Sequence, residues 1–278
     1  MGNTDARRLF TADVVDASDD QIDLARAALH VAMEERPALD VEQYVSRLDA
    51  LAAAISPELA AFPAPVDALA RMRELFARER FRGNEADYFD PANSFLDQVL
   101  DRRLGIPLTL SIVYLEVGWR CGLPLVGVGF PGHFLVKYVE PGGDHFIDPF
   151  EGARAISVAE LRGRMTAMFG TAATLRPEHL GAATKRDILV RLNANLKTVY
   201  TDRGDLTRAL AAVERILLLT PDATEEIRDR GLLYLGLHAY HLAAPDLTRY
   251  LAARPNADDA QAVREQLEVA ARERVRLN

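Results

Sequence analysis

The stretch "GIPLTLSIVYLEVGWRCGLPLVGVGFPGHFLVKY", residues 105–138, decides the fold of this chain because it joins a buried helix to a strand pair. Its first half, 107–121, is apolar on nearly every side, and a helix of that kind lies at the centre of a domain. Pro107 suits the first helical position, and Gly122 suits the residue just past the helix end. We therefore predict a central, buried helix over residues 107–121.

Three short β-prone runs follow this helix, at residues 125–130, 133–139 and 145–150. The last two are joined by "EPGGD", in which Gly142 and Gly143 supply the chemistry of a hairpin turn. A further helix is expected over 157–169. The middle of the chain is thus predicted to be an α+β unit, in which the central helix packs against a small antiparallel sheet.

The N-terminal third of the chain is predicted to be helical. Residues 40–55 place apolar side chains at i, i+3 and i+4 spacing, and Pro57 is expected to stop that helix. Residues 66–81 repeat the pattern. Asn93 and Ser94 are candidates to cap the next helix.

The C-terminal third is also helical, and its sequence repeats with a period of 34 residues. The same offset relates four residue pairs: Tyr200 and Tyr234, Ala209 and Ala243, Leu217 and Leu251, and Pro221 and Pro255. A 34-residue period is typical of a tetratricopeptide repeat, whose Gly position is filled by Gly231 in the second copy and Lys197 in the first. We expect one domain at 1–180 and an all-α repeat domain at 181–278, closed by a helix near 257–277.

The order of these segments resembles a known architecture. A helix led by "GIP", a "CGLP" exit, "PGHFLVKY" and then "IDPF" resemble the transglutaminase-like core, a papain-type fold. The longer run over residues 81–138 resembles the bacterial SirB-type family, in which tetratricopeptide repeats follow a transglutaminase-like domain. The resemblance implies a catalytic triad with Cys at the start of the helix, His at the start of a strand, and Asp on the next strand.

Two of the three triad positions match. His133 and Asp148 fall at the second and third, but the resemblance places the nucleophile at or beside Pro107, and proline has no thiol. The single cysteine, Cys121, lies fourteen positions further on. At 1.5 Å per residue this is about 21 Å away, at the helix end whose dipole opposes a thiolate. Cys121 is therefore interpreted as a small core residue.

Other polar groups near the helix start leave alternatives open. Ser111 lies one turn beyond Pro107 and could act as a nucleophile, although a hydroxyl inside a helix normally bonds back to the preceding turn. Water activated by His133 is another option. We expect a binding groove near the start of this helix, lined by residues in or just before it: Asn93, Ser94, Pro107, Thr109 and Glu116. Glu116 is also expected to form a buried salt bridge with Arg102, Arg103 or Arg120.

Composition narrows the classes of partner. The net charge of −8 argues against nucleic acid, and no apolar run approaches the length of a membrane span. One cysteine and acids within the first fifteen residues favour a cytoplasmic protein. No cofactor is expected. A metal site built on His133, His145, Asp148 and Glu116 is disfavoured, because His145 and Asp148 would face opposite sides of a regular strand.

Two functions of different class follow. The leading hypothesis is a non-catalytic transglutaminase-like and tetratricopeptide protein, a pseudoenzyme that binds a protein or peptide partner through its repeats and its core cleft. The alternative is a hydrolase or peptidase that uses His133 and Asp148 with Ser111 or an activated water. A third possibility is that the His133–Asp148 pair only stabilises the sheet.

Overall fold

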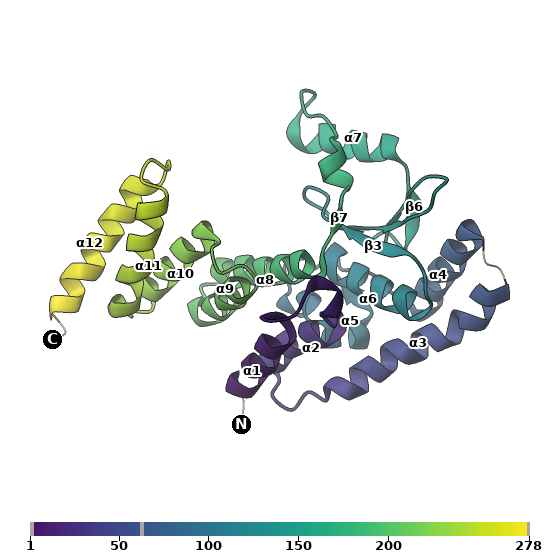
Figure 1. Ribbon diagram of the computed structural model, residues 1–278, viewed down its shortest axis with the longest axis horizontal. Helices are drawn as coiled ribbons and strands as arrows, with labels where there is room; N and C mark the ends of the chain where they lie inside the picture. Colours follow the sequence, from purple (N-terminus) through teal and green to yellow (C-terminus); the bar gives the residue numbers. More distant parts are fainter. Residues whose placement is uncertain (1–2, 62–63, 277–278) are drawn as a thin grey trace. The chain divides into compact units, whose positions relative to one another are not determined.

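The computed structural model describes residues 3–61 and 64–276, and contacts between residues divide the chain into two compact units, 1–192 and 193–278 (Figure 1). The division falls inside one helix, α8 (Lys185–Asp202). The first unit mixes helices with a small antiparallel sheet, and the second is all helical, so the predicted α+β class is confirmed. Of the described helices, none has the length and apolar character needed to cross a bilayer.

The first unit begins with helices that precede and support the central one. They are α1 (Asn3–Val14), α2 (Leu24–Glu35), α3 (Val41–Ala61), α4 (Pro65–Glu79) and α5 (Leu96–Arg102), with 3-10 turns η1 (Asp19–Gln21) and η2 (Pro91–Ser94). A two-stranded parallel pair, β1 (Arg82–Gly83) and β2 (Leu104–Gly105), links the ends of α4 and α5.

The predicted stop at Pro57 is wrong, because α3 continues through it to Ala61. A proline inside a helix removes one backbone hydrogen bond. Ile55 and Leu59, on either side of Pro57, are both buried, so packing against the core holds this turn helical. The hydroxyl of Ser56 also bonds to the carbonyl of Ala52 at 2.8 Å.

The central helix is α6 (Pro107–Arg120), as predicted. Every residue from Pro107 to Gly118 is buried, which is why the sequence there carries no polar face. Gly118 permits close contact with the sheet, since a Cβ atom at that position would lie 2.2 Å from Leu125 Cδ1. Just past the helix, Gly122 adopts a left-handed φ of 74°, the conformation for which glycine is favoured.

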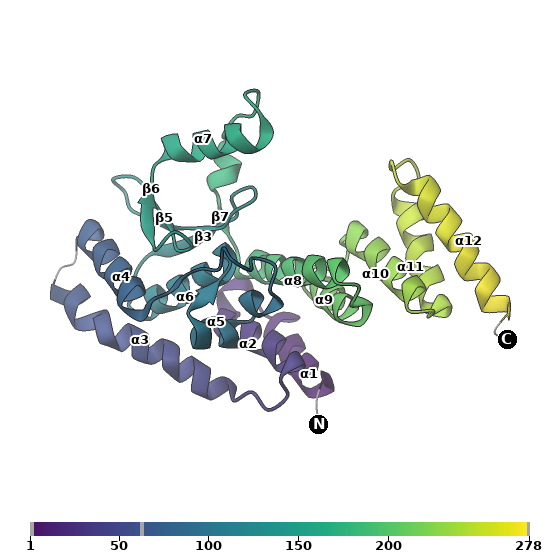
Figure 2. The same cartoon turned by 180° about the vertical axis from the view of Figure 1, so that it is seen from behind.

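The sheet has five strands in the order β6-β5-β4-β3-β7, and each neighbouring pair is antiparallel. These strands are β3 (Leu125–Val128), β4 (Leu135–Tyr138), β5 (His145–Asp148), β6 (Arg154–Ile156) and β7 (Ala182–Ala183). Helix α6 packs on one face, and α7 (Val158–Phe169) covers the other with the short turn η3 (Pro177–Leu180), as Figures 1 and 2 show. The buried residues on the α7 side include Val128, Leu135, Phe146, Leu161 and Met165.

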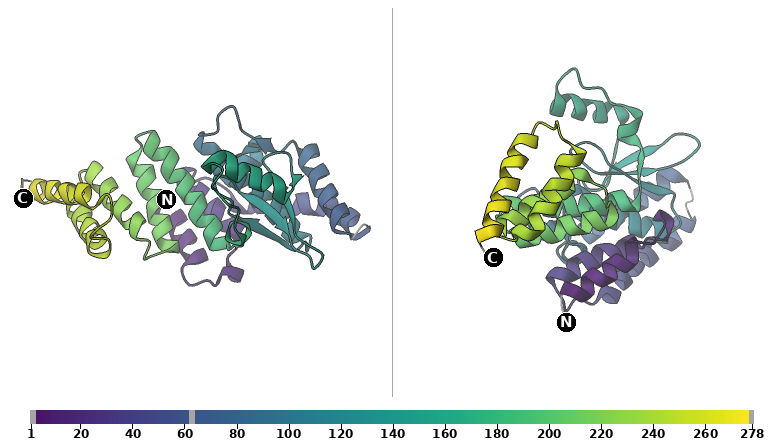
Figure 3. Two further views of the ribbon diagram at one scale, coloured as in Figure 1. Left: turned by 90° about the horizontal axis from the view of Figure 1, so that it is seen from above. Right: turned by 60° about the vertical axis from the view of Figure 1, so that its left-hand side comes forward.

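The second unit consists of the end of α8, then α9 (Leu206–Leu219), α10 (Thr224–Gly236), α11 (Tyr240–Ala253) and α12 (Ala260–Arg276). Figure 3 shows α10, α11 and α12 as successive helices that turn back on one another. The bounds of α9 and α11 differ by the predicted 34 residues at both ends. Gly204 and His238, also 34 apart, both have left-handed φ values, 72° and 59°. The predicted repeat is confirmed.

The two repeats differ at the position where the pattern favours glycine. A Cβ atom on Gly231 would lie 2.7 Å from Leu247 Cδ2, so the missing side chain lets α10 and α11 pack closely. In the first copy Lys197 occupies this position, and its Nζ lies 2.7 Å from Glu226 Oε1 and 2.9 Å from Asp229 Oδ2. The ammonium group of Lys197 therefore links α8 to α10 through two ion pairs.

Candidate functional site

His133 is presented by a tight turn formed by residues 130–133. Pro131 is followed by Gly132 at φ 68°, and the amide of His133 donates to the carbonyl of Phe130 at 3.0 Å. A proline followed by a residue with positive φ is the signature of a type II turn. The sequence "FPGH" thus places His133 immediately before strand β4.

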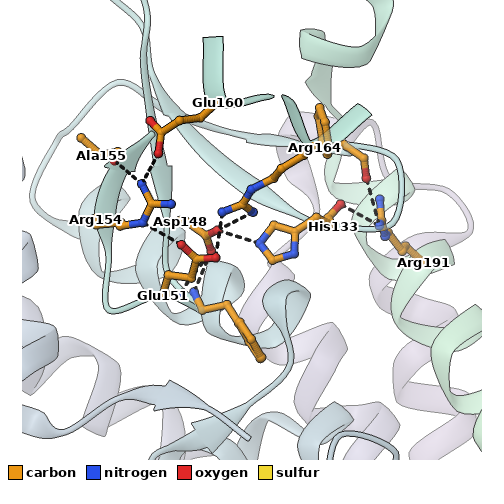
Figure 4. Close-up of polar contacts among 10 residues, drawn as sticks. His133, Asp148, Glu151, Arg154, Ala155, Glu160, Arg164 and Arg191 are labelled. Atoms are coloured by element: carbon orange, nitrogen blue, oxygen red, sulfur yellow. Dashed lines mark hydrogen bonds and ion pairs between the residues drawn. The ribbon is translucent and has the colours of Figure 1, made fainter. Parts of the chain in front are cut away.

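The register of the hairpin brings His133 to Asp148. Val136 pairs with Ile147, and continuing this register sets Leu135 opposite Asp148. His133 is then the diagonal neighbour of Asp148 on the same face of the sheet. His133 Nε2 lies 2.9 Å from Asp148 Oδ2 (Figure 4). The two residues that matched the triad positions are therefore in direct contact, on the face covered by α7.

Asp148 is a fully buried carboxylate with several donors around it. Its Oδ2 also accepts from Arg164 Nη1 at 3.0 Å, and its Oδ1 accepts from the amides of Phe150 and Glu151 at 3.1 and 3.4 Å. Burial by itself raises the pKa of Asp148. The hydrogen bonds and charges of His133 and Arg164 outweigh it, so the pKa lies below its ordinary value. Asp148 is consequently ionised at neutral pH.

The ionised carboxylate fixes the tautomer of His133. A carboxylate can only accept hydrogen bonds, so Nε2 of His133 must carry the proton. Nδ1 then holds a lone pair in the neutral ring, and within residues 3–61 and 64–276 no group hydrogen-bonds to it. The side chain of His133 is 15% exposed. The pair therefore leaves Nδ1 outside its hydrogen bonds, on a side chain that is partly exposed.

Two arginines that the sequence did not indicate hold this pair in place. Arg164 of α7 bonds to Asp148 and also to Glu151, at 2.8 Å. Arg191 of α8 donates to the carbonyls of His133 and Phe130 at 2.7 and 3.3 Å, which fixes the turn (Figure 4). Burial lowers the pKa of Arg191. Neither arginine belongs to a local motif, so no sequence signal could have identified it.

The polar residues before α6 form a buried network instead of capping a helix. The predicted cap at Asn93 or Ser94 is wrong, because the N-cap of α5 is Phe95, with no side-chain hydrogen bond. Asn93 Nδ2 donates to the carbonyl of Asp87 at 2.7 Å, and the hydroxyl of Thr109 donates to the carbonyl of Asn93 at 2.6 Å. Asn93 and Thr109 are fully buried, so they organise the loop that leads into α6.

In the described part of the chain, the hydrogen bonds of the His133–Asp148 pair do not include Pro107, at the expected nucleophile position, or Ser111, the alternative nucleophile. Ser111 is fully buried, and its hydroxyl has no hydrogen-bond partner in the described part of the chain. The expected bond from Ser111 to the preceding turn is therefore wrong. One chain of hydrogen bonds leads from Asp148 toward α6: Asp148 Oδ1 accepts from the amide of Phe150, the carbonyl of Phe150 accepts from Gly83 at 3.2 Å, and Gly83 pairs with Gly105.

Glu116 and Cys121 lie toward the other end of α6. Glu116 forms the predicted salt bridge, with Arg120 as its partner, and Arg120 also binds Asp49 of α3 at 2.7 Å. Burial raises the pKa of Glu116, although Arg120 opposes that effect. Cys121 is only half-buried, at the residue that caps the end of α6, so its interpretation as a core residue is wrong. Partial burial nevertheless raises the pKa of its thiol, which lies 3.6 Å from Ser56 Oγ. The structure thus separates Glu116 from the other groove residues.

Four exposed apolar side chains belong to two segments connected to the turn that carries His133, and we call them the apolar rim: Tyr88, Phe89, Met168 and Phe169. They are 39%, 62%, 51% and 57% exposed, respectively. Aromatic contacts connect one side of the rim to the site, because the ring centroids of Tyr88 and Phe150 are 6.1 Å apart and those of Phe150 and His133 are 6.0 Å apart. On the other side Met168 packs on the turn, since a Cβ on Gly132 would lie 2.0 Å from its Cε.

A metal centre finds no support in the described ranges, where no three His, Cys, Asp or Glu side chains gather closely enough to hold an ion. His145, which was weighed as a ligand, instead lies with its Nε2 2.6 Å from Glu140 Oε1. The polar chemistry of the site is therefore that of one imidazole, one carboxylate and two guanidinium groups.

Comparison with known proteins agrees with this architecture. Residues 42–194 match the transglutaminase-like superfamily, and residues 196–268 match the tetratricopeptide repeat, so the chain belongs to the transglutaminase-like superfamily.

Individual relatives identify the family within this superfamily more narrowly. The chain is 38% identical to a UPF0162 protein of Xylella fastidiosa (strain 9a5c), over 92% of this chain and 93% of the relative. It is 33% identical to a UPF0162 protein of Vibrio cholerae, over 70% and 73%, and 29% identical to the protein SirB1 of Salmonella typhimurium, over 66% and 68%. The resemblance to the SirB-type family is confirmed.

Proposed function

We propose that this protein is a non-catalytic member of its superfamily that binds a protein or peptide partner, as a scaffold or regulator in the cytoplasm. The observation that carries the proposal is Pro107 in the first turn of α6, where the family resemblance places a cysteine nucleophile. Proline has no thiol, hydroxyl or backbone N–H. His133 and Asp148 are, on this account, retained without the group that they would activate.

The available substitutes are poorly placed for catalysis. A nucleophile needs a hydrogen bond to its base, and the buried hydroxyl of Ser111 has no hydrogen-bond partner among residues 3–61 and 64–276. Cys121 lies at the C-terminal end of α6, about 21 Å along the helix from Pro107 at 1.5 Å per residue. The helix dipole and burial both disfavour its thiolate. Neither residue supplies an activated nucleophile to His133.

The apolar rim supports a binding role for the same site. Exposed apolar side chains that gather in one place typically mark surfaces that a partner covers. Met168 packs on the turn that Arg191 holds in place, and Phe89 is linked to the same site through the rings of Tyr88 and Phe150, so an apolar side chain of a peptide could bind between them near His133. A rigid turn lowers the entropic cost of binding.

The second unit offers a separate surface for a partner. A cavity of about 440 Å³ lies among α8, α9 and α10, and Leu206, Leu232 and Leu233 contribute its apolar wall. Helical repeats of this kind present extended binding surfaces. We propose that the repeats and the core site both contact the partner.

A peptide selection against the whole protein tests this function. We expect a displayed library of random peptides to yield sequences with an apolar anchor that bind saturably. Phe89→Ser and Met168→Ser should weaken that binding at least tenfold, as expected when central apolar anchors are lost. Val66→Ser, which removes an equally exposed apolar side chain on α4, is the matched control and should bind like the wild type. Recovery of no saturable peptide, or equal binding by all variants, would exclude the proposal for the core site.

The hydrolase alternative retains one favourable observation. His133 is hydrogen-bonded to an ionised carboxylate and, within the described residues, its Nδ1 has no other partner; in its neutral form such a ring can deprotonate a water molecule. That function requires turnover that depends on His133, whereas the binding function requires none.

A further inference from the structure

A second cluster of charged side chains, separate from His133, surrounds a pocket of about 360 Å³. We call it the arginine pocket, and its lining residues are Ala77, Arg80, Phe81, Arg82, Arg102 and Arg103. They come from the C-terminal ends of α4 and α5 and from strand β1. Because the two groups are about twenty residues apart in the sequence, the cluster forms only in the folded chain.

The arginine pocket carries more positive than negative charge. Arg102 Nη1 lies 2.8 Å from Asp90 Oδ2, and Arg103 Nη2 lies 3.0 Å from Glu79 Oε2. The side chains of Arg80 and Arg82 are exposed, and within the described ranges neither forms a hydrogen bond or an ion pair. Two guanidinium groups are therefore uncompensated at this spot, in a chain whose net charge is −8.

Capping of the two helices does not account for Arg80. Basic side chains near a helix C-terminus often bond to its last carbonyls. Here backbone amides already do so: the amide of Arg80 donates to Ala77 at 3.1 Å, and that of Phe81 donates to Phe76 at 2.9 Å. The guanidinium group of Arg80 is therefore not needed to bond to the last carbonyls of α4.

The backbone that carries the pocket is unusual and well fixed. Arg80 and Arg103 have φ values of 64° and 59°, in the left-handed region where a side chain is unfavourable and glycine is the usual residue. The amide of Arg82 donates to the carbonyl of Arg103 at 3.0 Å, and this hydrogen bond connects the segment after α4 to the segment after α5. Such strained positions cluster at binding and catalytic sites.

We propose that the arginine pocket binds the phosphate group of a small anionic ligand. The guanidinium fork matches phosphate oxygens in two parallel hydrogen bonds, and Arg80 and Arg82 have their donors free for it. The volume falls at the lower end of small-molecule sites. A nucleic acid would need a basic stripe that contacts many phosphates, which an acidic chain with one basic pocket does not offer. The inference is independent of the proposed peptide binding.

Calorimetric titration of the full-length chain with inorganic phosphate and with pyrophosphate tests the proposal. We expect saturable binding at one site, tighter for pyrophosphate and weakened by salt. Arg80→Gln and Arg82→Gln should each weaken it about tenfold or more, because each removes a charge-assisted contact. Arg73→Gln removes the same charge from an exposed position on α4 outside the pocket and should bind within about twofold of the wild type.

Both arginines of the pocket are exposed, so circular dichroism should show that the variants fold like the wild type. Absence of saturable binding at millimolar pyrophosphate would overturn the proposal. Equal weakening by Arg73→Gln would also overturn it, because it would indicate a general charge effect. Binding of a DNA duplex that Arg80→Gln and Arg82→Gln weaken but Arg73→Gln does not, without any binding of pyrophosphate, would assign the pocket to nucleic acid instead.

Discussion

The two ends of helix α6 differ in what their chemistry can support. The N-terminal end begins with Pro107 and connects through β2 and Phe150 to the strand that carries Asp148. The C-terminal end carries the only thiol of the chain, Cys121, where the dipole and burial oppose its ionisation. In the proposed function, this fold keeps the histidine and the carboxylate that match triad positions and has a proline where the resemblance places the nucleophile. The position of a thiol along a helix matters as much as its presence.

Two buried carboxyl groups of the first unit, Asp148 and Glu116, have pKa values that are shifted in opposite directions. Asp148 has four donors, and its pKa is lowered despite burial. Glu116 has one arginine partner within its own helix, and burial raises its pKa. The difference shows that Asp148 sits in a site built for a negative charge, whereas Glu116 is a structural ion pair.

Asp148→Asn should give the largest change. The substitution leaves Arg164 and His133 without their buried anion, and breaking such a pair costs about 3 kcal/mol of unfolding free energy. Urea denaturation measures it. Glu151→Gln is the control, because Glu151 also pairs with Arg164 but is exposed, and its loss should cost less than about 1 kcal/mol. Equal losses for both variants would contradict the contrast.

The same substitution should show a defined pH dependence. The folded pKa of Asp148 lies below its ordinary value of 3.8, so the unfolded chain binds the proton first as the pH falls. The stabilisation is therefore complete above that value and is lost as the pH falls through the folded pKa. Unfolding free energies of wild type and Asp148→Asn should differ by a constant amount at pH 5 to 7 and converge in strong acid. If the difference in unfolding free energy between the wild type and Asp148→Asn grew as the pH fell, the lowered pKa of Asp148 would be contradicted.

Cys121 should behave as an unactivated thiol. We expect Cys121→Ala to lower the unfolding free energy by no more than about 1 kcal/mol, since it removes one small, half-buried group. In the wild type, alkylation by iodoacetamide should be slow at pH 7 and rise only above the ordinary thiol range, because the pKa is raised. Rapid alkylation at neutral pH would show an activated thiol and would contradict the comparison of the two helix ends.

Glu116→Gln should give the smallest change at neutral pH, within about 0.5 kcal/mol, because Arg120 keeps Asp49 as a partner. Its pH dependence should oppose that of Asp148. A folded pKa above the ordinary value means that the wild type gains stability from protonation, and this gain is lost as the pH rises through the folded pKa. Stability of the wild type relative to Glu116→Gln should therefore fall between pH 4 and neutrality, and a rise would refute it.

Local patterns predicted the elements of this fold, whereas side-chain partners could not be predicted. The apolar surface of α6, the Gly142–Gly143 hairpin and the 34-residue repeat all follow from short-range periodicity and turn chemistry. The contact of Arg191 with His133 spans 58 residues and leaves no local trace. The errors at Pro57 and Asn93 have the same origin, because core packing at one and a buried network at the other override the local preference.

Hydrolysis of a panel of amide and ester substrates by wild type and His133→Ala is the most direct test of the central claim. The account predicts that the two proteins give the same rates, at the level of the buffer blank, because no nucleophile accompanies the His133–Asp148 pair. Turnover by the wild type that His133→Ala abolishes, in a variant that still folds, would contradict it and establish an enzyme.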